Sequence, residues 1–344
     1  MNRQPQQKFF ERSFTMKNGI LIITGSDEPN VPDVITHLTD ERVVRLNTNL
    51  LNTSTMSLEI EGDKIEVALN CDGQTLTSSE IKSIWCRRPP PASLQATGLS
   101  ELDQKFAESE NQRFFRALWN SFPSEGVTWL NHPLATYRVE HNKPLQLQTA
   151  HQAGLMTPTT LITSDLNKAR EFVANSTERT IFKTFSSYSR DEDGRPVGVY
   201  TTTISKEQLE NFGHELKFAP VIFQRYVPKK FELRITVIGK RVFACAIHSQ
   251  SSQRTKDDWR RYDFQNVVHE PHQLPTPIEQ SLLACMRSWG LQFGTIDMVV
   301  TPSGEYVFLE INPSGHWGWI EVLTGMPISK SLAELLINPT RYAL

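Results

Sequence analysis

The feature that most constrains this 344-residue sequence is a pair of apolar segments near its C-terminal end. Thr295–Val300 and Tyr306–Ile311 flank the turn-forming sequence Pro302-Ser-Gly-Glu305, and this arrangement predicts a β-hairpin. Glu310 interrupts the apolar second segment, where a carboxylate that is simply buried would be costly. The sequence therefore predicts a hairpin whose acidic side chain has a partner.

The hairpin carries three oxygen donors. Glu310 and Asn312 are two residues apart, so alternation along a strand places them on one face, and Asp297 on the preceding strand can face them. Carboxylate and amide oxygens suit Mg²⁺ shared with nucleotide phosphates better than they suit zinc. The competing interpretation is an acidic edge strand with a solvated face. The apolar flanks favour the magnesium site.

Composition excludes several classes of protein. With 38% hydrophobic and 22% charged residues, the chain is typical of globular proteins, and its length predicts two or three domains. A net charge of −2 argues against binding to nucleic acid, and no apolar run approaches the ~20 residues that span a membrane. The polar N-terminus shows no secretory signal, and the four scattered cysteines form no CxxC pair, so we expect a cytoplasmic protein. The loop Gly25–Asn30 lacks the GxGxxG dinucleotide fingerprint.

The near-neutral total hides an internal polarity. Residues 179–261 hold 16 basic and 9 acidic residues, whereas residues 262–344 hold 3 basic and 8 acidic residues. A basic band followed by an acidic band is what we expect of a chain that meets a triphosphate and Mg²⁺ in one cleft.

Hydrophobic periodicity predicts an α/β chain in three portions after a polar extension. We expect a long helix over residues 101–122, one helix over 134–153, and strands over 180–183, 221–226 and 233–237. The predicted divisions are an extension over residues 1–17, an N-terminal domain over 18–125, a central domain over 126–220 and a C-terminal domain over 221–344.

The basic band supplies candidate ligands for phosphate and nucleotide. Lys183 lies on an apolar strand and so needs an anionic partner, and the strand end Gln224–Val227 can offer backbone hydrogen bonds to an adenine edge. Glu232 and Arg234 alternate on one strand face, as a ribose ligand and a phosphate ligand would. Each residue alone is a weak signal, since an isolated charge is most often a solvated surface charge. Their order along the chain is much more specific.

That order resembles the ATP-grasp superfamily of carboxylate–amine and carboxylate–thiol ligases, over about residues 130–337. Within it the chain is most similar to graspetide synthetases, the microviridin-type ATP-grasp maturases of ribosomal peptides. The resemblance rests on short motifs in both halves of the chain: Trp85-Cys-Arg-Arg-Pro89, Phe223-Gln-Arg-Tyr-Val-Pro228, Glu232-Leu-Arg234, Asp258-Trp-Arg260 and Leu309-Glu-Ile-Asn-Pro-Ser-Gly-His-Trp317. It implies an ATP-grasp fold, α/β (α+β), with an N-terminal pre-ATP-grasp domain.

The resemblance also implies a role for each candidate residue. Lys143 and Lys183 would contact ATP phosphates, Gln224 and Val227 would form the adenine hinge, and Glu232 would hold the ribose. Catalysis would fall to Lys183 and to the cations that stabilise the phosphoryl group and the acyl-phosphate, Arg234 and Arg260. Asp297, Glu310 and Asn312 would bind Mg²⁺. Arg225 is a departure, because related sequences commonly have an acidic residue after the hinge Gln.

The implied activity is ATP-dependent macrocyclisation of a ribosomal precursor peptide that has a leader and an acidic core. An Asp or Glu carboxylate would become an acyl-phosphate, and a Ser/Thr hydroxyl or a Lys amine would displace phosphate to form an ω-ester or an ω-amide. Candidate contacts to the peptide are cationic: Arg87, Arg88, Arg254 and Arg261. Arg87 and Arg88 could equally pair with acidic residues of the first domain. The resemblance further suggests a homodimer.

Three alternatives remain open at this point. A ligase of the same superfamily could add amino acids to a free substrate or a protein tail, as glutathione synthetase-like or ribosomal-protein glutamate ligase-like enzymes do. A nucleotide-binding module would not ligate, and the intact metal set argues against it. A kinase-like enzyme would stop at phosphoryl transfer.

Overall fold

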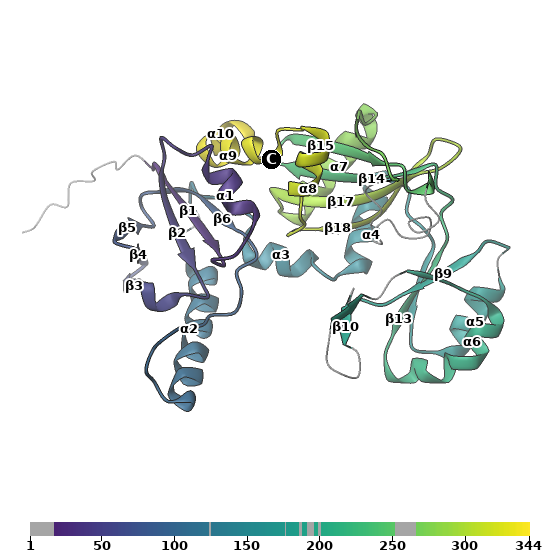
Figure 1. Cartoon of the computed structure of the whole chain (residues 1–344), viewed down its shortest axis with the longest axis horizontal. Helices are drawn as coiled ribbons and strands as arrows, with labels where there is room; N and C mark the ends of the chain where they lie inside the picture. The colour runs from purple at the N-terminus through teal and green to yellow at the C-terminus, as the bar shows by residue number, and fades with distance from the viewer. Residues whose placement is uncertain are drawn as a thin grey trace, which may run out of the picture. The chain divides into compact units, whose positions relative to one another are not determined.

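The structure is a computed structural model, and it describes residues 17–123, 125–175, 177–185, 188–190, 196–198, 201–251 and 266–344. The chain forms two compact units (Figure 1). Unit 1 comprises residues 1–28 and 38–129, and unit 2 comprises residues 29–37 and 130–344.

Unit 1 is built on a parallel sheet. Its strand order is β2-β1-β6-β7, with β1 parallel to both β2 and β6, and a second sheet β3-β4-β5 is an antiparallel meander. The elements in chain order are β1 (Gly19–Thr24), β2 (Arg42–Asn47), η1 (Leu51–Thr53), β3 (Ser54–Glu61), β4 (Lys64–Cys71), β5 (Gln74–Thr77), β6 (Ile81–Cys86), α2 (Glu101–Ser121) and β7 (Thr128–Leu130).

The core of unit 1 joins both sheets to α2. Every residue of β1 is buried, as expected of a central parallel strand with both faces covered. Phe115 and Leu118 are the buried residues of α2, and Trp129 packs edge-on against Phe122 beyond the end of that helix. The predicted helix over 101–122 is confirmed, and Ser100 caps its N-terminus by accepting a hydrogen bond from the Asp103 N–H.

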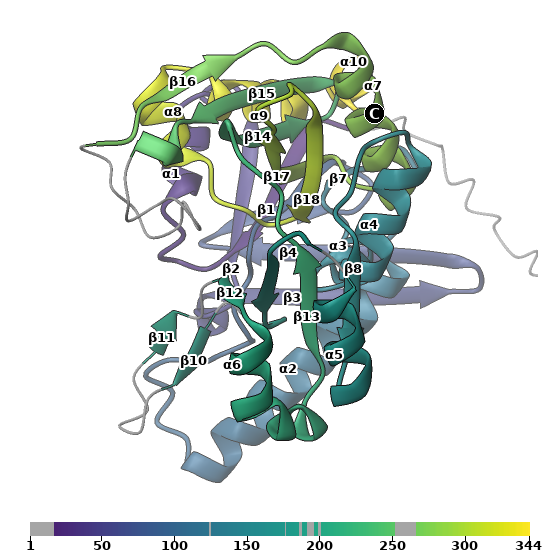
Figure 2. The ribbon, with the colours of Figure 1, turned by 90° about the vertical axis from the view of Figure 1, so that its right-hand side faces the viewer.

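The first half of unit 2 contains a four-stranded sheet in the order β12-β9-β13-β8, and α5 packs on β8 and on α6 (Figure 2). The elements are α1 (Asn30–Ile35), α3 (Pro133–Val139), α4 (Lys143–Gln152), β8 (Thr160–Thr163), α5 (Leu166–Ala174), β9 (Thr180–Lys183), β10 (Tyr188–Arg190), β11 (Pro196–Gly198), β12 (Thr202–Ile204), α6 (Lys206–Phe212), η2 (Gly213–Phe218) and β13 (Val221–Arg225).

The second half of unit 2 contains a five-stranded antiparallel sheet in the order β16-β15-β14-β17-β18. The elements are β14 (Phe231–Ile238), β15 (Arg241–Ile247), η3 (Ser249–Ser251), β16 (His269–His272), α7 (Thr276–Trp289), β17 (Phe293–Val300), β18 (Tyr306–Asn312), α8 (Gly318–Thr324), α9 (Ile328–Ile337) and α10 (Pro339–Tyr342).

The two faces of the five-stranded sheet differ in chemistry. On β14, Leu233, Ile235 and Val237 join a core cluster with α4 and α7, so alternation turns Glu232 and Arg234 to the opposite face. The same argument holds on β17, where Ile296 and Met298 join the core and the residue between them does not. The polar candidates therefore share one face of this sheet.

The single helix predicted over residues 134–153 is wrong, because the structure has two helices there. α3 ends at Val139, and His141 takes a positive φ of 58°, which a continuous helix does not allow. Asn142 then caps α4 by accepting a hydrogen bond from the Leu145 N–H at 3.2 Å. The break brings Lys143 to the first position of a new helix.

The predicted divisions at residues 125 and 220 stay predictions. The boundary between the two units falls at Trp129, and the structure places residues 130–344 in one unit. β13, which follows residue 220, pairs antiparallel with β8 and β9 of the four-stranded sheet. Within the described ranges, no helix has both the length and the apolar character needed to span a bilayer.

Candidate functional site

One pocket of unit 2 gathers most of the predicted site residues. Its walls come from β9 and β13 of the four-stranded sheet, from β14, β17 and β18 of the five-stranded sheet, and from the corner between α3 and α4. The predicted residues that line it are Lys143, Lys183, Gln224, Val227, Glu232, Asp297, Glu310 and Asn312. Residues that are up to 169 positions apart in the sequence therefore share one cavity.

The two proposed metal carboxylates face each other across the hairpin. Asp297 on β17 is the register partner of Glu310 on β18, and the register shifts next to this pair. The shift arises because Met298 pairs with Phe308, which leaves Leu309 as an extra residue in β18. Leu309 and Glu310 consequently both line the pocket, although they are neighbours in sequence.

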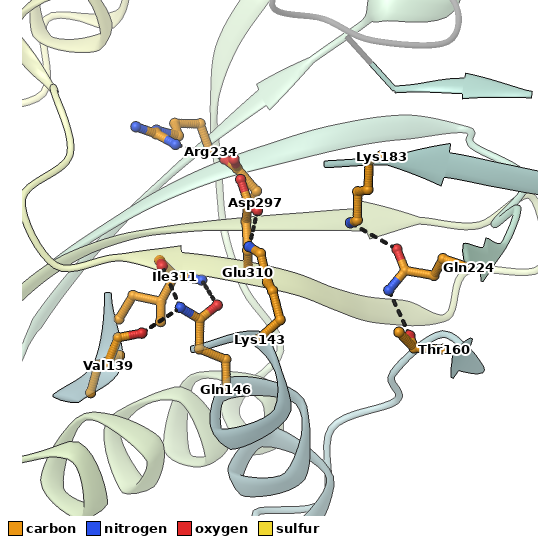
Figure 3. Close-up of polar contacts among 10 residues, drawn as sticks. All are labelled: Val139, Lys143, Gln146, Thr160, Lys183, Gln224, Arg234, Asp297, Glu310 and Ile311. Atoms are coloured by element: carbon orange, nitrogen blue, oxygen red, sulfur yellow. Dashed lines mark hydrogen bonds and ion pairs between the residues drawn. The ribbon is translucent and has the colours of Figure 1, made fainter. Parts of the chain in front are cut away.

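Each of these carboxylates is paired with a cation (Figure 3). The Asp297 carboxylate accepts a hydrogen bond from the Arg234 guanidinium at 2.9 Å, and the two residues are register partners on β17 and β14. The Lys143 ammonium forms an ion pair with the Glu310 carboxylate. Because both pairs are largely buried, their electrostatic interaction is stronger than that of an exposed pair.

The donor set fits magnesium in its chemistry. Mg²⁺ is commonly held by one or two carboxylates together with substrate phosphates and water. Asp297 and Glu310 supply two carboxylates, and the Asn312 side-chain oxygen, which accepts a hydrogen bond from the Ser314 N–H at 2.9 Å, supplies a third oxygen. No group of three His, Cys, Asp or Glu side chains in the described part of the chain is arranged to hold a metal.

A glycine allows the turn after Asn312. A Cβ atom on Gly315 would lie 1.7 Å from the Thr295 hydroxyl oxygen, so no other residue fits there without rearrangement. Thr295 is in turn the register partner of Asn312. The sequence Asn312-Pro-Ser-Gly315 therefore folds back closely over the start of the hairpin.

The opposite wall of the pocket holds Lys183 through Gln224. The Lys183 ammonium donates a hydrogen bond to the Gln224 side-chain oxygen at 2.9 Å, and the Gln224 amide donates to the Thr160 hydroxyl at 2.8 Å (Figure 3). The Gln224 side chain is buried, so this chain of polar groups fixes its orientation. Sequence reasoning assigned only the backbone of Gln224 and missed Thr160.

The segment between the two sheets begins after Arg225, which is the last residue of β13. Arg225 turns toward α5, where its guanidinium lies 4.2 Å from the centre of the Phe172 ring and donates to the Thr180 hydroxyl at 2.9 Å. Tyr226 donates its backbone N–H to the Arg179 carbonyl at 2.9 Å. The unusual arginine at 225 is thus accommodated by packing on the helix, while Val227 still lines the pocket.

Glu232 has a cationic neighbour that the sequence analysis did not identify. The Lys229 ammonium forms an ion pair with the Glu232 carboxylate, and both side chains are at most 8% exposed. A polar group buried to this degree needs a partner, and the pair provides one. The signal available in the sequence was the i,i+3 spacing of opposite charges in Lys229-Lys-Phe-Glu232.

Two buried amides that the sequence analysis also missed hold the hairpin. Gln146 on α4 bonds to the Ile311 backbone, and Asn131 bonds to both ends of the hairpin. The Asn131 oxygen accepts from the N–H groups of Gln292 and Phe293 at 2.7 and 2.9 Å, and its amide donates to the Pro313 carbonyl at 3.1 Å. Gln146 could have been noticed because it lies one helical turn after Lys143.

Several predicted residues lie elsewhere. Arg87 is buried in unit 1, where its guanidinium pairs with Glu28 at 3.1 Å, and burial lowers the pKa of Arg87 to about 10. Arg88 is exposed, with a φ of 45°. Neither is among the residues that line the pocket. Arg254, Arg260 and Arg261, together with Asp258, lie outside the described residues.

One family model and several solved structures are similar to this chain. A family model described as the MvdD pre-ATP grasp domain matches residues 19–136. Macrocyclase MdnC from Microcystis aeruginosa MRC, solved with its precursor peptide MdnA, is 30% identical, with a TM-score of 0.77 over 93% of this chain and 99% of its own. A RiPP-associated ATP-grasp ligase from Chryseobacterium gregarium, solved with ADP and a leader and core peptide, is 28% identical, with a TM-score of 0.83 over 94% of this chain and 97% of its own. Macrocyclase MdnB from Microcystis aeruginosa MRC is 29% identical, with a TM-score of 0.71 over 93% and 99%. A search of curated proteins finds no match.

Proposed function

Because the chain belongs to the graspetide synthetases, a family of ATP-grasp ligases, we propose that it closes rings within a ribosomally made precursor peptide. The chain has the ATP-grasp fold and is an ATP-dependent ligase. The proposed substrate is a peptide with a leader and an acidic core. Relatives solved with a precursor peptide, or with a leader and a core peptide, support this proposal.

The proposed reaction has two steps. In the first, an oxygen of an Asp or Glu side-chain carboxylate attacks the γ-phosphorus of ATP, the bond to the β–γ bridging oxygen breaks, and ADP leaves. In the second, a Ser/Thr hydroxyl or a Lys amine attacks the acyl carbon, the bond to the phosphate oxygen breaks, and phosphate leaves with release of a proton. Each ring loses one water, and the product is an ω-ester or an ω-amide.

The observation that carries the proposal is the convergence of opposite charges in one pocket. Lys143, Lys183 and Lys229 line the same cavity as Asp297 and Glu310. Lys143 and Lys183 would bind the phosphates of ATP, and Arg234, which contacts Asp297, would stabilise the charge on the transferred group. We assign the same role to Arg260, which lies outside the described residues.

The remaining pocket residues would bind the nucleotide and the metal. Gln224 and Val227 would hold the adenine through backbone atoms. Glu232, which is oriented by Lys229, would accept a hydrogen bond from a ribose hydroxyl. Asp297, Glu310 and Asn312 would hold Mg²⁺, which when bound offsets the negative charge of the phosphates. Lys143 pairs with Glu310 and Arg234 pairs with Asp297, so each of the two carboxylates already has a cation beside it.

Product mass tests the proposal. The protein is incubated with ATP, Mg²⁺ and a candidate precursor peptide that carries Thr, Ser or Lys together with Asp or Glu near its C-terminus. We expect the loss of one water per ring. Mild base then separates the products, because it opens esters and leaves amides intact.

The matched control is Glu310→Gln, which removes a charge from the metal set and keeps the shape of the side chain. We expect it to lower the rate of ring closure by about 100-fold or more. A peptide that gains an amino-acid residue would instead indicate tail ligation, and a peptide that gains a phosphate would indicate a phosphotransferase. Either result would overturn the proposal.

A further inference from the structure

Gln146 makes three hydrogen bonds with one buried side chain. Its amide nitrogen donates to the Val139 carbonyl at 2.8 Å and to the Ile311 carbonyl at 3.1 Å, and its oxygen accepts from the Ile311 N–H at 3.2 Å. Figure 3 shows the side chain of Gln146 between Val139 and Ile311. The residue is 1% exposed. Both hydrogens of the amide and one lone pair of its oxygen are therefore used.

The position of Ile311 gives these bonds their significance. β18 ends the order of the five-stranded sheet, so the backbone groups on its outer side have no neighbouring strand in that sheet. The Gln146 amide takes the place of a peptide unit in such a strand and satisfies both backbone groups of Ile311. Ile311 lies between Glu310 and Asn312, which are two of the three proposed metal ligands.

The same contacts also fix the α3–α4 corner. Val139 is the last residue of α3, and Gln146 lies one turn after Lys143 at the start of α4. Lys143 pairs with Glu310 while Gln146 bonds to the next residue of β18. One helix turn therefore holds both the backbone and a side chain of the strand that carries the ligands.

We propose that Gln146 is a positioning residue for the metal site: it holds β18 at Ile311 so that Glu310 and Asn312 keep the spacing that the cation needs. The inference rests on the proposed function, since it assumes that these residues bind Mg²⁺. Groups that orient metal ligands typically contribute about 10- to 100-fold to metal affinity. Gln146 does so through the backbone and does not touch the cation.

Direct metal binding tests the role of Gln146. The titration uses Mn²⁺ as the spectroscopic probe, with ADP present, and electron paramagnetic resonance reports the free ion. Gln146→Leu keeps much of the buried volume and removes all three hydrogen bonds. We expect Mn²⁺ to bind this variant about 10- to 100-fold more weakly than wild type.

The control is Ser329→Ala, which removes a buried polar contact made by a residue that does not line the pocket. The Ser329 hydroxyl accepts from the Trp317 indole N–H at 3.1 Å and donates to Glu321, and the residue is 2% exposed. We expect this variant to lose thermal stability while its affinity for Mn²⁺ stays that of wild type. A purely structural role for Gln146 predicts the same outcome for both variants.

The outcomes distinguish a failure of the inference about Gln146 from a failure of the proposed metal site on which it rests. If wild type binds no Mn²⁺ with ADP, the proposed metal site itself is wrong. If wild type binds and Gln146→Leu binds equally well, the inference is overturned. Gln146→Met is the second variant if Gln146→Leu does not fold. If neither folds, hydrogen exchange on wild type decides: Mn²⁺ with ADP should slow exchange at Ile311, and unchanged exchange overturns the inference.

Discussion

Two buried arginine–carboxylate pairs have similar geometry and different surroundings. In unit 1, Arg87 lies 3.1 Å from Glu28, and the two side chains are 2% and 7% exposed. In unit 2, Arg234 lies 2.9 Å from Asp297, and the side chains are 10% and 12% exposed. Asp297 lines the pocket of unit 2 together with Lys143, Lys183 and Lys229, and Arg87 and Glu28 are not among the residues that line that pocket. From this comparison we expect the second pair to act in the proposed reaction and the first pair to stabilise unit 1.

The largest expected effect is on catalysis in unit 2. Arg234→Lys keeps the charge and loses the forked geometry that can hold a carboxylate and a phosphoryl group together. We expect turnover of ATP with peptide to fall about 100- to 1000-fold, with little change in the melting temperature. Phosphate release measures the turnover.

Arg241→Lys is the matched control for Arg234. Arg241 also pairs with a carboxylate, that of Glu334, but it is 31% exposed, and Glu334 does not line the pocket whereas Asp297 does. Its variant should turn over ATP at the wild-type rate. Equal loss of activity in the two variants would contradict the prediction that the Arg234–Asp297 pair takes part in the reaction and the Arg241–Glu334 pair does not.

The second effect is on stability in unit 1. Arg87→Met leaves the Glu28 carboxylate buried without its cation, which typically costs about 3–5 kcal/mol. We expect denaturant unfolding to show that loss, while the rate of ring closure by the folded fraction is unchanged.

The control for Arg87 is Arg42→Met, because Arg42 forms a pair with Glu80 that is 42% and 23% exposed in the same unit. Its removal should cost less than about 1 kcal/mol. An Arg87→Met protein with wild-type stability and no peptide modification would show instead that Arg87 binds substrate, which is the other role that the sequence allowed.

The smallest expected effect is a dependence of stability on pH, which we expect to differ between the two units. All nine histidines lie in unit 2. Burial lowers the pKa of His269, with a further contribution from His248, and burial lowers the pKa of His272 against the opposing influence of Glu270. The neutral imidazoles therefore stabilise unit 2 above the ordinary pKa of 6.5, and this stabilisation is lost as the pH falls through the lowered values.

We expect unit 2 to become more open to hydrogen exchange than unit 1 when the pH falls from about 7.5 to about 5.5, after correction for the intrinsic rate. His269→Gln combined with His272→Gln should reduce the difference. Equal responses of the two units, or no effect of the double variant, would contradict this assignment.

Local pattern predicted much of the fold. The hairpin of β17 and β18, the strand β9 and the helix α2 follow from alternation, turn residues and a cap, all of which act within a few residues. The predicted ATP-grasp fold class and the family are confirmed. The helix predicted over 134–153 is wrong because the backbone leaves the helical conformation at Glu140, where ψ is 135°, and at His141, where φ is 58°, and periodicity carries no sign of this break. The proposed homodimer stays a prediction.

The sequence by itself determined which chemical groups this protein has and, on β14 and β17, which strand face each one takes, since alternation is a local property of the backbone. On β18 the extra residue Leu309 interrupts the alternation, so Phe308 lies in the core while Glu310 lines the pocket. Only the tertiary structure decided which groups meet. Arg234 could pair with any carboxylate until the register of β14 and β17 placed it opposite Asp297, and Gln146 was an ordinary helix residue until α4 packed on β18. Register and packing depend on contacts between residues 63 and 165 positions apart, and no pattern within a short window contains them.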